Sequence, residues 1–140
     1  MSHRKRRKTF REVHLFQNAM DAAMEVFHLF RQFPEHEEQE ELASDIIRGT
    51  RIVCAKIAAA WESRRTGDVC LAYLKVAKTH TAETLVFLDV AHGLGYLDVT
   101  QRDRLFDTYR SILRRLDRLI TKWQRSSNDF LDRYGTIDED

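Results

Sequence analysis

The sequence is poor in several features, and each shortage excludes a class of protein. It holds only two cysteines, Cys54 and Cys70, too few for the disulfide framework of a small secreted domain. Its single proline, Pro34, and its isolated glycines leave no glycine-rich phosphate-binding loop. No apolar run reaches the roughly 18 residues of a membrane-spanning helix, and the basic N-terminus lacks the apolar stretch of a secretory signal. We therefore expect a cytoplasmic protein with buried free thiols and no contact with a membrane.

The apolar residues of the sequence follow a helical periodicity. Apolar residues recur three and four apart in four long segments, at about residues 12–32, 37–61, 69–92 and 100–124. The links between them are short, and no segment alternates in the manner of a strand. The pattern predicts an all-α protein, folded as an antiparallel up-down four-helix bundle. Residues 10–125 would form this bundle, between a basic, disordered arm at 1–9 and an acidic, disordered tail at 126–140.

Each segment has a predicted buried face. The four faces are Phe16, Ala19, Met20, Ala23, Phe27 and Phe30; then Leu42, Ile46, Gly49, Val53, Ile57 and Ala60; then Leu71, Leu74, Ala77, Thr81, Leu85 and Leu88; then Leu105, Tyr109, Ile112, Leu116, Leu119 and Trp123.

Two pairs, Thr9 with Glu12 and Thr100 with Asp103, have the spacing of a capping box, in which each side chain bonds the other residue's backbone N–H. These pairs predict where the first and fourth helices begin.

Charge is balanced overall but strongly segregated along the chain. The formal net charge is only +1. An acidic block at residues 35–45 opens the second helix, where carboxylates favour the positive end of the helix dipole. The fourth helix is basic. The candidate nucleic-acid-binding residues are Arg110, Arg114, Arg115, Arg118, Lys122 and Arg125 on that helix, and Arg4, Lys5, Arg6, Arg7 and Lys8 in the arm. Four of them lie four residues apart along one helix edge and could follow a phosphate backbone, although a solvated face neutralised by Asp107 and Asp117 is the alternative.

No catalytic or metal-binding constellation stands out. Glu25 and His28 have the Glu-x-x-His spacing of di-iron bundles, but such sites need a second copy of the motif and two further glutamates. His80 and Glu83 stand in the reverse order. We therefore expect a protein that is not an enzyme and that carries no metal and no cofactor.

The order of landmarks along the chain resembles the bacterial four-helix-bundle family of 23S rRNA-intervening sequence proteins. The chain has Phe10, Val13 and Phe16-Gln17 where that family opens, and Phe33-Pro34-Glu35 where its first helix ends. Further matching landmarks are Leu42, Ile46, Arg48, Ile57, Ala58, Tyr73-Leu74, Ala77, Glu83 and Leu94-Gly95-Tyr96-Leu97. Lys56 and Ala59 replace the Asn and Glu of the family's Asn-Ile-Ala-Glu-Gly stretch.

The resemblance implies a bundle that assembles into a ring, typically a homopentamer. The accessory protein of diversity-generating retroelements looks like a relative, which implies nucleic-acid binding and, in a retroelement, a reverse transcriptase as partner. The sequence thus leaves two interpretations open. One is a ring-forming scaffold that binds RNA or DNA through a basic surface, and the other is a structural or protein-interaction module without a nucleic-acid role.

Overall fold

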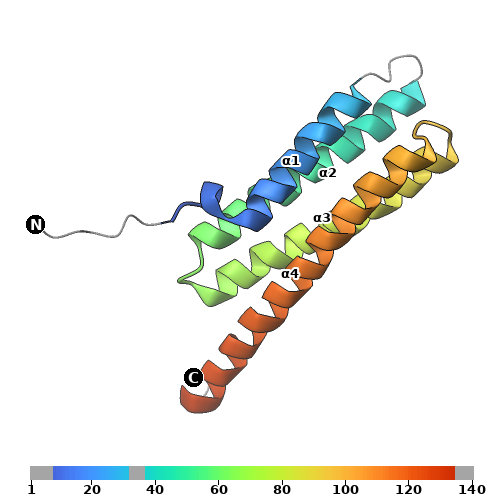
Figure 1. The fold of residues 1–140 in the computed structure, drawn as a ribbon. Helices are drawn as coiled ribbons and strands as arrows, with labels where there is room; N and C mark the ends of the chain where they lie inside the picture. Colours follow the sequence, from blue (N-terminus) through green and yellow to red (C-terminus); the bar gives the residue numbers. More distant parts are fainter. Residues whose placement is uncertain (1–7, 32–36, 135–140) are drawn as a thin grey trace, which may run out of the picture.

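The protein is a bundle of four long helices (Figure 1). The computed structural model describes residues 8–31 and 37–134, with side chains described up to residue 126. A short 3-10 helix, η1 (Phe10–Glu12), precedes α1 (His14–Phe30), α2 (Glu37–Glu62), α3 (Gly67–Gly93) and α4 (Val99–Tyr134). The described residues contain no strand, so the predicted all-α class is confirmed.

Contacts between helices set their order around the bundle. α1 packs on α2, α2 on α3, α3 on α4, and α4 returns to α1, whereas the described parts of α1 and α3 do not touch each other. α1 and α3 are therefore diagonal, as are α2 and α4. Between α3 and α4, Lys78 pairs with Asp117 and Asp89 pairs with Arg102. Residue numbers therefore rise along α3 in the direction in which they fall along α4. These two helices therefore run antiparallel, and Figure 1 shows α1 and α3 pointing the same way.

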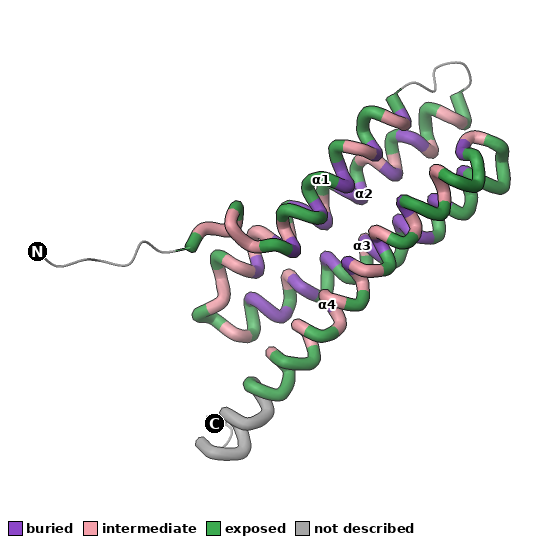
Figure 2. The backbone as a smooth tube through the Cα atoms, in the orientation of Figure 1, coloured by how far each residue is buried: buried purple, intermediate pink, exposed green. Residues whose placement is uncertain are grey.

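The core matches three of the four predicted faces. The predicted faces of α3 and of the first half of α4 are fully buried, with Leu88, Leu105 and Leu116 at 0% exposure, and on α2 only Leu42 is half-buried. Figure 2 shows this buried side facing inward on each helix. Cys54 and Cys70 are buried free thiols, also as expected.

The predicted face of α1 is wrong by a partial turn. Ala19, Ala23 and Phe30 are buried, but Met20 and Phe27 are 42% and 40% exposed. The buried positions are Leu15, Ala19, Ala22, Ala23, Val26 and Phe30. The longer apolar side chains suggested the wrong centre for the face, because half of the buried positions of α1 are alanines, which contribute little to the apolar pattern.

Both predicted capping boxes are also wrong. The Thr9 side chain makes no capping hydrogen bond, and η1 followed by Val13 precedes α1 instead. At the start of α4 the reciprocal pair is Asp98 and Gln101: the Asp98 carboxylate accepts from the Gln101 backbone N–H at 2.8 Å, and the Gln101 side chain accepts from the Asp98 N–H at 3.3 Å. The helix accordingly begins at Val99.

Gly95 ends the third helix through its backbone conformation. Its φ is +81°, which an L side chain rarely adopts. The Tyr96 N–H donates to the Ala91 carbonyl at 2.9 Å and the Gly95 N–H to the His92 carbonyl at 3.0 Å, which is the Schellman pattern. The reversal brings Arg102 back against Asp89 and fixes α4 alongside α3.

The predicted boundaries of the bundle need one correction. α4 continues to Tyr134, so the helix does not end near residue 125. Residues 135–140 of the predicted tail lie outside the described residues, as does the predicted arm apart from Lys8 and Thr9.

Candidate nucleic-acid interface

The first arginines of α4 are committed to ion pairs within the bundle. Arg102 donates from Nε to Asp89 of α3 at 2.9 Å and from a terminal nitrogen to Asp103 at 3.0 Å. These hydrogen bonds raise the pKa of Arg102 further above its ordinary value. Arg104 pairs with Glu25 of α1. This end of α4 uses its positive charge to join α3 and α1.

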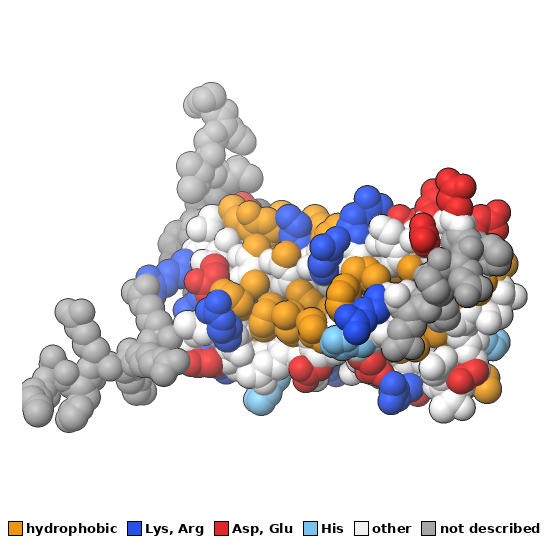
Figure 3. Space-filling model, turned by 90° about the horizontal axis from the view of Figure 1, so that it is seen from above, with side chains coloured by type: hydrophobic (Ala, Val, Ile, Leu, Met, Phe, Trp, Pro, Cys, Tyr) orange, Lys and Arg blue, Asp and Glu red, His pale blue; other side chains and the backbone are white. Residues whose placement is uncertain are grey.

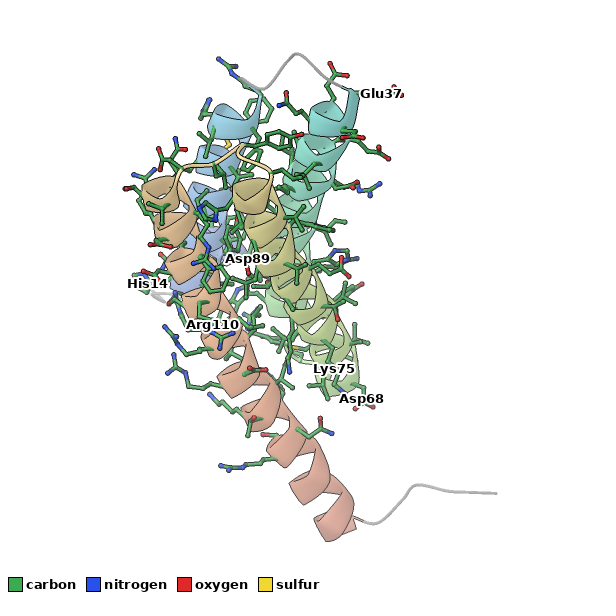
Figure 4. The ribbon with its side chains drawn as sticks, turned by 90° about the vertical axis from the view of Figure 1, so that its right-hand side faces the viewer. His14, Glu37, Asp68, Lys75, Asp89 and Arg110 are labelled. Atoms are coloured by element: carbon green, nitrogen blue, oxygen red, sulfur yellow. The ribbon has the colours of Figure 1, made fainter. Side chains whose placement is uncertain are left out.

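The later basic residues of α4 have no such partners. Arg110, Arg114, Arg118, Lys122 and Arg125 are exposed, and none forms an ion pair with another residue whose side chain is described. In Figure 4, nitrogen-tipped side chains project from α4 at Arg110 and below it. This set, with the half-buried Arg115, is called the α4 basic edge below.

Arg115 differs from the rest because it lies against α1. With the Asn18 amide oriented so that both of its ends are satisfied, its oxygen accepts from Arg115 at 2.8 Å and its nitrogen donates to the His14 carbonyl at 3.2 Å. Arg115 is therefore partly structural, and four of the six predicted α4 residues keep the regular four-residue spacing on the free edge.

Neutralisation by neighbouring carboxylates is weaker than the sequence suggested. Asp117 points to α3, where its Oδ1 lies 2.7 Å from Lys78 Nζ. Asp107 lies one turn before Arg110 and is the one exposed carboxylate near the start of the edge. The free cations outnumber the free anions along this side of the helix.

The fold adds basic residues to the α4 basic edge from distant parts of the sequence. η1, the end of α2, the start of α3 and the second half of α4 meet at one end of the bundle (Figure 1). The described basic residues of this end are Lys8, Arg11, Lys56, Arg64, Arg65, Lys75, Lys78, Arg114, Arg115, Arg118, Lys122 and Arg125, against Glu12, Glu62, Asp68 and Asp117. We call it the basic end. Sequence reasoning missed its contributions from α2 and α3, since their charges look balanced when each helix is read alone.

The opposite end is acidic. It carries Glu25, Glu37, Glu38, Glu40, Glu41, Asp45, Asp89, Asp98, Asp103 and Asp107, against Arg31, Arg48, Arg102 and Arg104. Figure 3 shows acidic side chains gathered where α2 begins. The antiparallel arrangement therefore turns a near-neutral chain into a rod with ends of opposite charge.

Aromatic side chains fix the start of the arm at the basic end. The Trp61 indole N–H donates to the Lys8 carbonyl at 3.1 Å, and the Arg64 guanidinium lies 4.2 Å from the centre of the Trp61 ring. Phe10 meets Phe16 edge to face at 5.0 Å between ring centres. Lys8 is exposed there, while the other predicted arm residues, Arg4, Lys5, Arg6 and Arg7, lie outside the described residues.

The described residues offer no metal site: no group of three or more His, Cys, Asp or Glu side chains is placed to hold an ion. Glu25 of the Glu-x-x-His spacing forms an ion pair with Arg104. Within the same described residues, no helix is long and apolar enough to cross a membrane.

Fold and surface together define a four-helix-bundle protein with a free basic edge on α4. Comparison with known families places it further: the family described as 23S rRNA-intervening sequence protein matches residues 11–118. The chain belongs to this family. No curated protein and no solved structure matches it.

Proposed function

We propose that this protein is a non-enzymatic, ring-forming scaffold that binds RNA or DNA through its basic end. The observation that carries the proposal is the α4 basic edge, whose Arg110, Arg114, Arg118 and Lys122 are exposed and lack described ion-pair partners. Free cations at regular spacing are suited to phosphates, because each neutralised phosphate releases condensed counterions. Since no base-reading groove or motif accompanies them, binding follows charge and shape with little sequence preference.

Assembly strengthens this mode of binding. The family resemblance suggests five copies, and each copy would add one basic edge to the ring. Several weak contacts on one polymer give an avidity far above that of one contact. A reverse transcriptase is the partner to test if the chain belongs to a retroelement, and the cytoplasm is the compartment where RNA or DNA would be met.

The direct test compares the wild type with a variant in which Arg110, Arg114, Arg118 and Lys122 become Gln. Light scattering gives the mass, which for a pentamer is five times the 16.5 kDa of the chain. Binding is measured with a structured RNA and a DNA duplex of equal length over a range of salt. Loss of binding with assembly intact supports the proposal, and unchanged binding rejects it.

A second function is favoured by the charged ends of the rod. The acidic end of one copy could meet the basic end of another, so that the α4 basic edge serves assembly alone. The same quadruple variant would then lower the mass, and the wild type would bind neither nucleic acid at moderate salt.

A further inference from the structure

α3 is apolar on two sides, which one bundle does not need. Its inward residues follow spacings of four and three: Cys70, Leu74, Ala77, Thr81, Thr84, Leu88 and Ala91 are all buried. A second series with spacings of three and four runs along the outer side, through Val69, Ala72, Val76, Thr79, Glu83, Val86 and Val90. All seven are exposed, and the four valines are 38–58% exposed. Such spacing is typical of a seam between packed helices.

Exposed apolar side chains are not scattered over the described surface. The large ones gather on α3 and on α1, where Met20, Met24 and Phe27 are 40–45% exposed, while α2 has none and α4 has only its first residue, Val99. Figure 3 shows hydrophobic side chains forming a band over the face where α1 and α2 lie. We call Met20, Met24 and Phe27 the α1 patch and the outer series of α3 the α3 seam.

We propose that the α3 seam packs against the α1 patch of a second copy of this chain. The inference rests on the assembly part of the proposed function and names the surfaces that would form it. α1 and α3 are diagonal in the bundle, so the two apolar surfaces are separate and lie on different helices. Pairing two unlike surfaces is head-to-tail association, which closes into a ring when the rotation allows.

Helix direction and charge fit the same pairing. α1 and α3 point the same way within a bundle, so like-oriented bundles around a ring bring α3 alongside α1 in parallel. The α3 seam contains one carboxylate, Glu83, and the α1 patch is bordered by His28 and Arg31, which lie 5.6 Å and 5.8 Å from the centre of the Phe27 ring. Pairing two copies of α3 would leave the α1 patch uncovered, whereas the head-to-tail contact covers both. The flexible methionines suit a surface that must fit the valines of another helix.

The first experiment is site-directed cross-linking. Val76→Cys is placed in a tagged chain and Met24→Cys in an untagged one, and the chains are mixed, refolded and treated with a short bifunctional maleimide. A cross-linked pair of tagged and untagged chains is expected only in the mixture. Cys54 and Cys70 are buried, and burial raises the pKa of each thiol, so the wild type should stay uncross-linked. Cross-linking of Val76→Cys chains with one another alone would show α3 pairing with α3 and overturn the inference.

The second experiment changes the surface and measures mass. Val76→Glu combined with Val86→Glu should reduce the assembly to a 16.5 kDa monomer in light scattering, with unchanged helical circular dichroism. Thr121→Glu, a substitution at another exposed position on α4, is the control and should keep the wild-type mass. A wild type that is itself monomeric rejects the assembly part of the proposed function. If the wild type is an oligomer and the variant with Val76→Glu and Val86→Glu keeps the same mass, only the interface inferred here is rejected. If that variant does not fold, the cross-linking experiment tests the interface instead.

Discussion

Lys78 of α3 lies 2.7 Å from Asp117 of α4, Nζ to Oδ1, and this pair removes a carboxylate from the basic side of α4. Asp117 is three residues after Arg114 and next to Arg118, so the sequence of the helix predicts that Asp117 neutralises these arginines. Because α3 takes it, Arg114 and Arg118 keep their charge for another partner. Breaking this pair is therefore expected to change the charge pattern of α4 without touching its arginines.

Lys78→Ala should weaken nucleic-acid binding, both because Lys78 belongs to the basic end and because it pairs with Asp117. The freed Asp117 can then turn towards Arg114 and Arg118 and lower the number of phosphates they neutralise. The exposed pair itself contributes only about 0–1 kcal/mol to folding, so the stability should change little. The measurement is affinity against salt, and the double variant Lys78→Ala with Asp117→Ala is the control that should recover the part of the loss caused by the freed Asp117. Equal affinity of all three proteins would contradict the interpretation of Asp117.

Changing Arg110, Arg114, Arg118 and Lys122 to Gln should reduce both the affinity and its dependence on salt. Each lost phosphate contact lowers the slope of log affinity against log salt by about 0.7–0.9, so four contacts lower it by about 3. The matched control changes Arg102, whose charge is used within the bundle by Asp89 and Asp103. Arg102→Gln should keep the slope, and a slope that falls equally in both variants would mean that net charge alone is being measured.

Leu116→Ala should lower the free energy of unfolding by about 2–5 kcal/mol, because Leu116 is 0% exposed at the centre of the inward side of α4. Chemical denaturation followed by circular dichroism measures the loss. Arg118→Ala, two residues along on the exposed side, should stay within about 0.5 kcal/mol of the wild type. Equal stability of Leu116→Ala and the wild type would contradict the described core.

Tyr109→Phe should stabilise the bundle at neutral pH. The Tyr109 hydroxyl is fully buried and forms no hydrogen bond of normal geometry among the described residues, although the Thr50 hydroxyl lies near it. Removing an unsatisfied buried hydroxyl is worth about 1 kcal/mol or more. A loss of stability in denaturant titration would show that the hydroxyl is hydrogen-bonded.

Alkaline pH should unfold the protein through Tyr109 and Cys54. Burial raises the pKa of the Cys54 thiol from 9.0 to about 11. Burial also raises the pKa of Tyr109 well above its ordinary 10.0, and the charges of Cys54 and Glu25 add to this effect while Thr50 opposes it. Both groups ionise more easily in the unfolded chain, so their stabilisation is complete below pH 9 and is lost as the pH rises. Each contributes a slope of about 1.4 kcal/mol per pH unit, from pH 9 to about 11 for Cys54 and above pH 10 for Tyr109. Cys54→Ala and Tyr109→Phe should each make the fall of the unfolding free energy shallower in its own range.

Gly49 and Gly95 should respond oppositely to alanine. A Cβ at Gly49 would sit 3.5 Å from the Thr84 hydroxyl, an ordinary contact, so Gly49→Ala should gain about 0.5–1 kcal/mol of helix stability. Gly95 has a φ of +81°, so Gly95→Ala should cost a comparable amount or more. Thermal unfolding of the two variants beside the wild type gives the sign of each effect.

The sequence by itself determined the four helices, most of their buried faces and the row of basic residues on α4. These features follow from spacing within one segment, since residues three and four apart share a helix face whatever the rest of the chain does. The all-α class and the family were therefore accessible from the order of residues, and the family match over residues 11–118 agrees.

Only the tertiary structure decided which of these local patterns are satisfied inside the bundle. Met20 and Phe27 were predicted to be core residues because large apolar side chains usually are, yet both are exposed and alanines fill much of the buried side of α1. Asp117 was a candidate to neutralise the arginines of α4, but in the bundle it pairs with Lys78 of α3. The basic and acidic ends exist because antiparallel packing brings together halves of helices that are distant in sequence, and such pairing depends on contacts that no single segment encodes.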